Sequence, residues 1–496
     1  MIDDGFRGLV QGFPVWQQNE APDHVPRGDP LSAALGWLAD NAEFFDPPCW
    51  ERHLPKRPFP SAPLLELLQL CHVLARRQDG VGREVTERAV RITQRVLERP
   101  SFAAGLYRAD GMFTYHVWFL ALAERLGVPV PPLRRAAQGL LDAGARPTAS
   151  GVGALELRHA ADLGGFAAAH LPDRAWLARH WLDGQHLDAF RLNDVECYGI
   201  THAAFYATGF GAAPCPVDLT VLNGPVELLA GAYLAAGNLD LGAELVATSL
   251  LAGGTTAFTR AAWRRIRGAQ HEDGAVPGPL YRAADAARTT GDTTRAYRFG
   301  TCYHTTIAFA LTAALFHETE VPETALGNVA GAAEAETPDI TRFAVTALSS
   351  GAGWWSPPPR AGEAVRQASP PPGLPLPGNP AALREIAVRA GAADGTARQT
   401  WSAVVDQGIV IAVRRGDLDL LACFLVAAAE LDLLAHSVPA AAVAYLAAQQ
   451  QPDGGFGVPA ADVDPLAHEP VRTRLTATCL DAFAAVLSAA RRHVTE

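Results

Sequence analysis

A short turn that follows a helix and recurs along the chain is the feature that most limits how this chain folds. Its copies contain Asp-Gly, and the next helix begins on an aromatic or small residue. A helix–turn–helix of roughly 40 to 50 residues cannot bury its apolar stripe alone, so the hairpins must stack as an open solenoid or a closed ring. The copies are Arg108-Ala109-Asp110-Gly111-Met112-Phe113, Gln270-His271-Glu272-Asp273-Gly274-Ala275, Gln451-Pro452-Asp453-Gly454-Gly455-Phe456-Gly457 and a degenerate one at 183–190.

Helical periodicity begins near Leu31 and recurs in pairs, with Pro and Gly at the breaks. Comparable period-two alternation is missing, although Thr220-Val221-Leu222 and Gly408-Ile409-Val410-Ile411 are candidates for short extended pieces. The pattern predicts an all-α chain. The expected helices cover 31–44, 63–77, 84–98, 113–126, 131–144, 152–166, 174–184, 196–208, 225–236, 239–252, 258–269, 302–317, 340–350, 379–391, 400–413, 417–435, 438–450 and 472–492.

Composition along the chain predicts four segments. Residues 1–28 are polar and rich in Pro, Gly and Gln, which indicates an N-terminal arm. Residues 29–351 hold the repeated helical hairpins, and residues 379–496 hold the hairpins that close the structure. Between them, 352–378 contains eight prolines that forbid a helix, so it is a Pro-rich loop or linker.

The turn after the helix that ends near Gln450 resembles a known family. Gln450-Gln451-Pro452-Asp453-Gly454-Gly455-Phe456-Gly457 is similar to the Gln-rich, Gly-Gly-Phe turn of the prenyltransferase and squalene-cyclase repeat superfamily. Members of that superfamily are α/α toroids. The resemblance therefore implies an α/α toroid of repeated helical hairpins, and we expect a closed ring rather than a solenoid.

Two segments resemble zinc-binding segments of toroid enzymes. Asp194-Val195-Glu196-Cys197-Tyr198 and Cys302-Tyr303-His304-Thr305-Thr306 look like the Asp-x-Cys-Tyr and Tyr-His-Thr segments of protein prenyltransferase β subunits. That resemblance implies zinc held by Cys197, His304 and Asp194, with a fourth position left for substrate. Asp194 stands three positions before Cys197 instead of two, so Glu196 is an alternative ligand. Cys302 enters the metal set because lanthionine cyclases use a Cys and a Cys-His pair.

Histidines recur at a nearly constant period and supply candidate catalytic groups. His72, His116, His159 and His202 are separated by 44, 43 and 43 positions, which predicts one imidazole on each successive helix that faces the centre. The alternative is that they are core histidines bonded to backbone carbonyls. His116 and His202 lie near helix starts, and together with Tyr198 and Tyr303 they are the candidate catalytic side chains.

The segment from Tyr198 to Tyr206 also resembles a Tyr-x-x-Thr-His-x-x-Phe-Tyr signature of an uncharacterised bacterial family found beside biosynthetic genes. The polar pair Thr201-His202 on an otherwise apolar helix favours a lined cavity over a solid core. The resemblance implies a role in specialised metabolism and names no reaction.

Carboxylates offer other chemistries. Class II terpene cyclases protonate their substrates with an Asp-x-Asp-Asp motif, and the nearest match is Asp417-Leu418-Asp419, which lacks the adjacent second acid. A glycosidase needs two carboxylates across a cleft, for which Asp194, Glu196, Glu272 and Asp273 are candidates.

Charge and composition exclude several classes. The net charge of -11 gives no basic surface for nucleic acid. Because the only lysine is Lys56, no phosphate-binding Gly-x-x-x-x-Gly-Lys-Ser/Thr loop exists. Seven irregularly spaced cysteines indicate reduced thiols. The start, Met1-Ile2-Asp3-Asp4, does not look like a secretion signal, and no apolar run reaches the roughly 20 residues of a membrane span, so we expect a cytoplasmic protein without a membrane partner.

These observations lead to three functional hypotheses. The first is a metal-dependent transferase or cyclase, with zinc at the mouth of a central cavity activating a nucleophile toward a small-molecule or peptide substrate. The second is a metal-free terpene or polyene cyclase that uses an acid the sequence does not identify. The third is a non-catalytic helical-repeat scaffold that binds a partner protein.

Overall fold

The computed structural model describes residues 29–77, 80–145, 151–182, 187, 189–319, 380–392, 398–451, 454–457 and 465–495. All regular secondary structure in these residues is helical, which confirms the all-α prediction. The predicted arm 1–28, the predicted helix 340–350 and the Pro-rich segment 352–378 lie outside the described residues. The chain divides into two compact units, and the described residues of the second are Thr319 and those from Pro380 onward.

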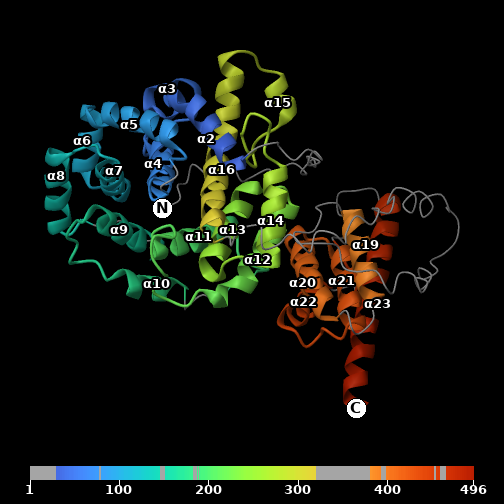
Figure 1. Ribbon diagram of the computed structural model, residues 1–496. Helices are drawn as coiled ribbons and strands as arrows, with labels where there is room; N and C mark the ends of the chain where they lie inside the picture. Colours follow the sequence, from blue (N-terminus) through green and yellow to red (C-terminus); the bar gives the residue numbers. More distant parts are fainter. Residues whose placement is uncertain are drawn as a thin grey trace, which may run out of the picture. The chain divides into compact units, whose positions relative to one another are not determined.

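The first unit contains helices that are buried along most of their length and helices that bury a single stripe; their order along the chain can be followed in Figure 1. Every residue of α13 from Leu239 to Leu250 is buried, whereas the amphipathic α8 buries only Ala137 and Leu141. The elements are α2 (Pro30–Asp40), η1 (Ala42–Phe45), α3 (Pro47–His53), α4 (Ala62–Ala75), α5 (Arg83–Leu97), α6 (Pro100–Arg108), α7 (Phe113–Arg125), α8 (Pro131–Asp142), α9 (Gly151–Gly164), α10 (Arg174–Leu182), α11 (Asp194–Thr208), η2 (Thr220–Leu222), α12 (Asn223–Ala235), α13 (Leu239–Gly253), α14 (Ala257–Gly268), α15 (Ala283–Ala287) and α16 (Asp292–Thr319).

Six of these, α4, α7, α9, α11, α13 and α16, are called the core helices below. The first five pack successively, each against the next. α16 bonds to α13, where the Thr312 hydroxyl donates to the Ala243 carbonyl over 3.1 Å. It also bonds to the residues that follow α4, where Arg77 Nη1 donates to the Ala314 carbonyl over 3.5 Å, and to Glu66 of α4 through His304. The last core helix thus touches both its predecessor and the first.

An aromatic cluster fixes α16 to the N-terminal elements. The ring of Phe299 stacks on Phe44 at 5.0 Å and meets Phe45 edge-on at 4.9 Å. Because this packing extends α16 toward its N-terminus, the helix begins at Asp292, ten residues before the predicted start. Its segment Asp292–Phe316 is long and apolar enough to cross a bilayer, but 83% of the apolar window is buried inside the protein, as expected of a core helix.

Two copies of the recurring turn have the same hydrogen bonds. The side-chain amide of Gln270 donates to the Gly274 carbonyl, and the side-chain amide of Gln450 donates to the Gly454 carbonyl, both over 3.0 Å. Each glycine lies in the left-handed region, with φ of 95° at Gly274 and 84° at Gly454, which L side chains disfavour. The sequence pattern therefore marks a defined local structure.

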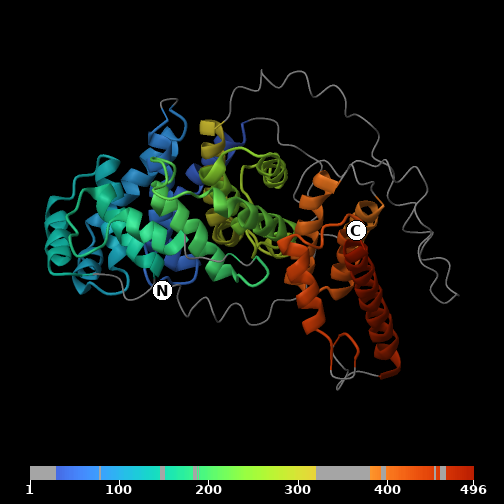
Figure 2. The same ribbon diagram turned by 90° about the horizontal axis from the view of Figure 1, so that it is seen from below.

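The second unit is built from helices that pack around α21, which contacts α19, α20, α22 and α23. The long α23 runs to the C-terminal end and is drawn red in both views (Figures 1 and 2). Its elements are α19 (Pro380–Gly391), α20 (Arg398–Arg415), α21 (Leu418–Glu430), α22 (Ser437–Ala448) and α23 (Pro465–Thr495).

Two local predictions were wrong. Thr220–Leu222 forms a 3₁₀ turn leading into α12, and Gly408–Ile411 lies inside α20, so neither is extended. Burial explains the second error, because an apolar run of β-branched residues suits a fully buried helix as well as a strand. Three short helices, α3, α6 and α15, were not predicted; α3 and α6 begin on proline, which is favoured at the first helical position.

Candidate functional site

Helix α13 carries two carboxyl groups into the interior of the first unit. Asp240 and Glu244 stand one turn apart, and their side chains are only 4% and 5% exposed. The helix begins where the Asn238 side chain accepts from the Leu241 amide, which places Asp240 in the first turn, where the helix dipole favours a negative charge. Two acids on one buried face require partners.

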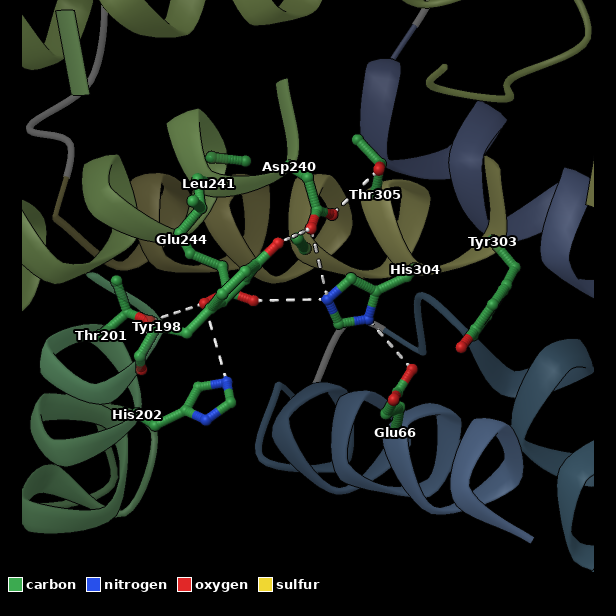
Figure 3. A network of polar contacts seen from close by, with 12 residues as sticks. Glu66, Tyr198, Thr201, His202, Asp240, Leu241, Glu244, Tyr303, His304 and Thr305 are labelled. Carbon is green, nitrogen blue, oxygen red and sulfur yellow. Dashed lines mark hydrogen bonds and ion pairs between the residues drawn. The ribbon is translucent and has the colours of Figure 1, made fainter. Parts of the chain in front are cut away.

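The imidazole of His304 on α16 supplies the main partner (Figure 3). Its Nε2 atom lies 3.6 Å from Asp240 Oδ2 and 3.5 Å from Glu244 Oε1. Its Nδ1 atom lies 3.0 Å from Oε2 of Glu66 on α4. A single histidine therefore joins carboxyl groups from two other core helices.

Helix α11 contributes hydroxyl groups and a second imidazole. The Tyr198 hydroxyl donates to Asp240 Oδ2 over 2.5 Å, and the Thr201 hydroxyl donates to Glu244 Oε2 over 2.6 Å. His202 Nε2 lies 3.8 Å from Glu244 Oε2. The Thr305 hydroxyl, next to His304, donates to Asp240 Oδ1 over 2.9 Å. The central polar cluster, as named below, consists of Glu66, Tyr198, Thr201, His202, Asp240, Glu244, His304 and Thr305.

The cluster is graded in exposure. The side chains of Glu66, His202 and His304 are each about a third exposed, whereas Asp240 and Glu244 are buried. Water therefore reaches the two imidazoles and Glu66, whereas the α13 carboxyl groups are shielded from it.

The two α13 acids have opposite pKa shifts. Burial, together with the negative charge of Glu244, raises the pKa of Asp240 above its usual value, although His304 opposes this. Burial also acts to raise the pKa of Glu244, but the His304 hydrogen bond and the nearby His202 outweigh it and lower that pKa. Asp240 is thus the acid that keeps its proton to higher pH.

His304 is held as a cation. Burial disfavours an imidazolium, but the carboxyl groups of Asp240, Glu66 and Glu244 outweigh it, so the pKa of His304 lies well above its usual value. The arrangement combines two buried carboxyl groups whose pKa values are shifted in opposite directions with an imidazole whose charged form is favoured.

The polar layer continues onto the remaining two core helices. The Tyr206 hydroxyl donates to Oε1 of Glu156 on α9 over 2.7 Å, and burial raises the pKa of Glu156. Glu156 and burial, with Glu66, raise the pKa of Tyr115 on α7. Every core helix therefore brings at least one polar or ionisable group to this layer.

The structure brings three of the predicted site residues together, namely Tyr198, His202 and His304. Cys197 and Asp194 lie earlier on α11, where both contact the Tyr233 hydroxyl. That hydroxyl donates to Asp194 Oδ1 over 2.5 Å, and its oxygen lies 3.6 Å from Cys197 Sγ.

The other two residues of the second predicted segment have different surroundings. Burial raises the pKa of the Cys302 thiol to about 11, and its Sγ atom lies 3.8 Å from the Thr301 hydroxyl. The Tyr303 hydroxyl accepts from Arg57 Nη2 over 2.9 Å, and its ring stacks on Phe299. Tyr303 thus belongs to the aromatic cluster that anchors α16.

The periodic histidines do lie on successive core helices, α4, α7, α9 and α11. His116 Nδ1 bonds the Met112 carbonyl at 3.0 Å, as the core-histidine alternative expects. Burial lowers the pKa of His72 to about 4 and that of His159 to about 3. Of the four, His202 joins the central polar cluster.

Three of the other candidate carboxylates have structural partners. Glu196 completes a capping box with Asn193, Asp273 pairs with Arg298 at 2.7 Å, and Asp417 caps α21. In the part of the chain that the structure describes, no group of three or more His, Cys, Asp or Glu side chains has a geometry suited to a metal ion.

Sequence reasoning missed Glu66, Asp240 and Glu244. Each lies within a helix that was recognised by its apolar residues, such as Leu239-Asp240-Leu241-Gly242-Ala243-Glu244-Leu245. The available signal was the acids themselves, because a carboxyl group on a helix that is apolar all round must be buried.

Comparison with known proteins places these elements in one family. No curated protein and no solved structure matches the chain. Residues 31–314, more than half of the chain, match the model of a family described as a domain of unknown function (DUF6895). The match runs from α2 into α16 and includes every residue of the central polar cluster. The chain therefore belongs to the DUF6895 family.

Proposed function

We propose that this protein is an acid–base enzyme in which Asp240 donates a proton to a small organic substrate. The observation that carries the proposal is the buried Asp240–Glu244 pair, bridged by His304, which itself stays accessible to solvent. Titratable groups whose environments push their pKa values apart are a hallmark of acid–base sites.

The residues have complementary roles in such a step. Asp240 transfers its proton to a carbon or oxygen of the substrate and becomes a carboxylate. The His304 cation and the hydroxyl groups of Tyr198 and Thr305 stabilise that new charge, since they already contact its oxygens. The proton returns to Asp240 when the product loses one. Glu66 holds His304 in place through its Nδ1 atom.

The α/α toroid predicted from the resemblance suits this site. Five core helices pack in succession and α16 contacts both ends of the series, as a closed ring of six would require. In that arrangement the polar layer lies around the central axis. A substrate entering along the axis would meet His202 and His304 before Asp240.

Among the three hypotheses from the sequence, cyclisation begun by protonation agrees best with these contacts, because they supply the acid that the sequence did not identify. Zinc on Cys197 and His304 remains a prediction from resemblance alone. The scaffold hypothesis gives no reason for two desolvated carboxyl groups at this place, because even a paired buried charge is often no more stabilising than well-packed apolar side chains. A role in bacterial specialised metabolism is part of the proposal.

Deuterium transfer tests the proposal whichever product is formed. The purified protein is incubated in D₂O with a panel of linear polyenes and prenyl compounds, and mass spectrometry detects solvent deuterium in any product. Asp240→Asn should abolish incorporation, whereas Glu227→Gln, which changes a half-buried carboxyl group on α12, should not. Equal incorporation by wild type and Asp240→Asn would refute the proposal.

A further inference from the structure

The second unit has hydrogen bonds that match those of the last helices of the first unit. After the Gln270 turn, the Val276 amide donates to the Thr306 hydroxyl over 3.0 Å. After the Gln450 turn, the Phe456 amide donates to the Thr476 hydroxyl, also over 3.0 Å. Thr476 of α23 therefore occupies the position of Thr306 of α16.

The helix before each turn is also repeated. Asn238 caps α13 by accepting from Leu241, and Asp417 caps α21 by accepting from Leu420. A glycine with positive φ precedes each cap. By this register Asp419 stands where Asp240 stands in the first unit.

The ionic contacts follow the same register. Asp240 pairs with His304, and Asp419 pairs with Arg474, which is two residues before Thr476 as His304 is two before Thr306. Arg384 of α19 approaches Asp419 Oδ2 to 2.7 Å, as Tyr198 of α11 bonds Asp240 Oδ2. Three of the six core helices, α11, α13 and α16, thus have counterparts in the second unit. These counterparts are α19, α21 and α23, in that order.

The correspondence exposes a difference at the last helix. In α16 the face formed by Tyr303, Ile307, Ala310 and Ala314 is buried, and its neighbours include α4 and the aromatic cluster. The same register gives Thr473, Ala477, Leu480 and Ala484 on α23, and all four are exposed. One turn further, Leu487 continues this apolar stripe; Leu480 and Leu487 are 51% and 58% exposed. A face that is covered in the first unit is uncovered in the second.

The first helix of the repeat has a matching uncovered edge. The α9-facing side of α11 includes Gly199, near Val152, and the register through Arg384 places Glu385 and Val388 on that side of α19. Val388 is exposed, as is Glu385. At the level of Asp419 the α19 edge carries the exposed Glu385, whereas the α23 edge carries the largely exposed Arg474. These two side chains have opposite charges, and both edges also expose apolar side chains.

We propose that the second unit pairs with the second unit of another copy of this chain, α23 of each copy packing against α19 of the other. A two-fold axis makes both contacts identical and covers both edges at once. The pair would contain six core helices, three from each copy. The inference uses the ring closure proposed for the first unit and none of its chemistry.

Oligomeric mass in solution gives the first test. The full chain should run as a dimer in light scattering coupled to size-exclusion chromatography. Leu480→Glu and Val388→Glu each place a charge in the contact and should raise the dimer dissociation constant at least about tenfold. Leu280→Glu changes an equally exposed leucine of the first unit and should leave the dimer intact. A monomeric wild type, as expected if another part of the same chain covers these edges, would overturn the proposal.

Mixed disulfides test the pairing itself. Val388→Cys and Leu480→Cys are made in separate chains, mixed and oxidised. We expect a product of twice the chain mass from the mixture and little from either variant alone, because residue 388 of one copy faces residue 480 of the other. A dimer that survives Leu480→Glu, or that gives no mixed product, would place the contact elsewhere and refute this interface.

Discussion

The Nε2 atom of His304 lies 3.6 Å from a carboxyl oxygen of Asp240, although one residue is on α16 and the other on α13. Each group changes the proton affinity of the other, because the imidazolium favours the carboxylate and the carboxylate favours the imidazolium. Burial decides the outcome for Asp240, whose pKa is still raised, while the combined carboxyl groups decide it for His304.

Removing the imidazolium should raise the pKa of Asp240 further. In His304→Gln the buried carboxyl group loses the nearest positive charge and keeps the negative charge of Glu244. Carbon-13 NMR of selectively labelled aspartate, assigned with Asp240→Asn, should show Asp240 titrating above the usual aspartate range in the wild type and higher still in His304→Gln. A downward shift in the variant would contradict the assigned charges.

The free energy of unfolding should depend on pH through the protonation of His304. Because its folded-state pKa is raised above the unfolded value, its contribution is complete below about pH 6.5 and is lost as pH rises through the folded pKa. Urea unfolding at a series of pH values should show the free energy of unfolding falling over that interval. The fall should flatten in His304→Gln and persist in His170→Gln, where an exposed histidine is changed.

His72 and His159 should remain neutral from pH 8 to pH 5, because burial lowers their pKa values to about 4 and about 3. Long-range nitrogen–proton NMR of labelled histidine should find both as neutral tautomers over this range and His304 as a cation at pH 6. A depressed pKa in the fold also means that stability is lost as pH falls from about 6.5 toward these values, since the unfolded chain takes up the protons. Protonation of His159 near pH 6 would contradict the burial of this residue, which is only 4% exposed.

Two glycines that share a backbone conformation should respond differently to alanine. Gly274 and Gly454 both have positive φ, so each substitution carries a conformational cost of about 1 kcal/mol or somewhat more. A Cβ at Gly274 would also overlap the carbonyl oxygen of Ala33 in α2, whereas a Cβ at Gly454 has no described atom within 4 Å. We expect Gly274→Ala to destabilise the protein by more than about 4 kcal/mol, measured by chemical unfolding. Similar losses at the two positions would contradict the close contact with α2.

Metal removal separates the proposed acid from the zinc predicted by resemblance. We expect protein dialysed against a chelator to retain deuterium incorporation, and Cys197→Ala to retain it as well. Elemental analysis of the untreated protein accompanies the assay. Stoichiometric zinc that is lost in both Cys197→Ala and His304→Ala, together with activity, would favour the metal-activated nucleophile instead.

The sequence predicted most helices, because their apolar residues recur at the helical period and because Pro and Gly mark their ends. It also predicted three members of the central polar cluster, Tyr198, His202 and His304, from short motifs at helix starts. Asp240 and Glu66 were missed because their importance depends on which helices meet, and periodicity describes one helix at a time. The repeated turn was recognised, but the register between the two units required the hydrogen bonds of Thr306 and Thr476.

The contact between the Gln270 turn and α2 bears on how the protein is made. The side-chain amide of Gln270 donates to the Pro30 carbonyl over 3.0 Å. Glu66 of α4 contacts His304, which belongs to α16 and is therefore made much later. During synthesis from the N-terminus, the apolar surface of the earliest helices that α16 covers therefore stays exposed until His304 has left the ribosome. Such long-range contacts slow folding and extend the period in which a nascent chain needs a chaperone. A truncated chain that ends before α16 should accumulate as aggregate rather than as a smaller folded domain.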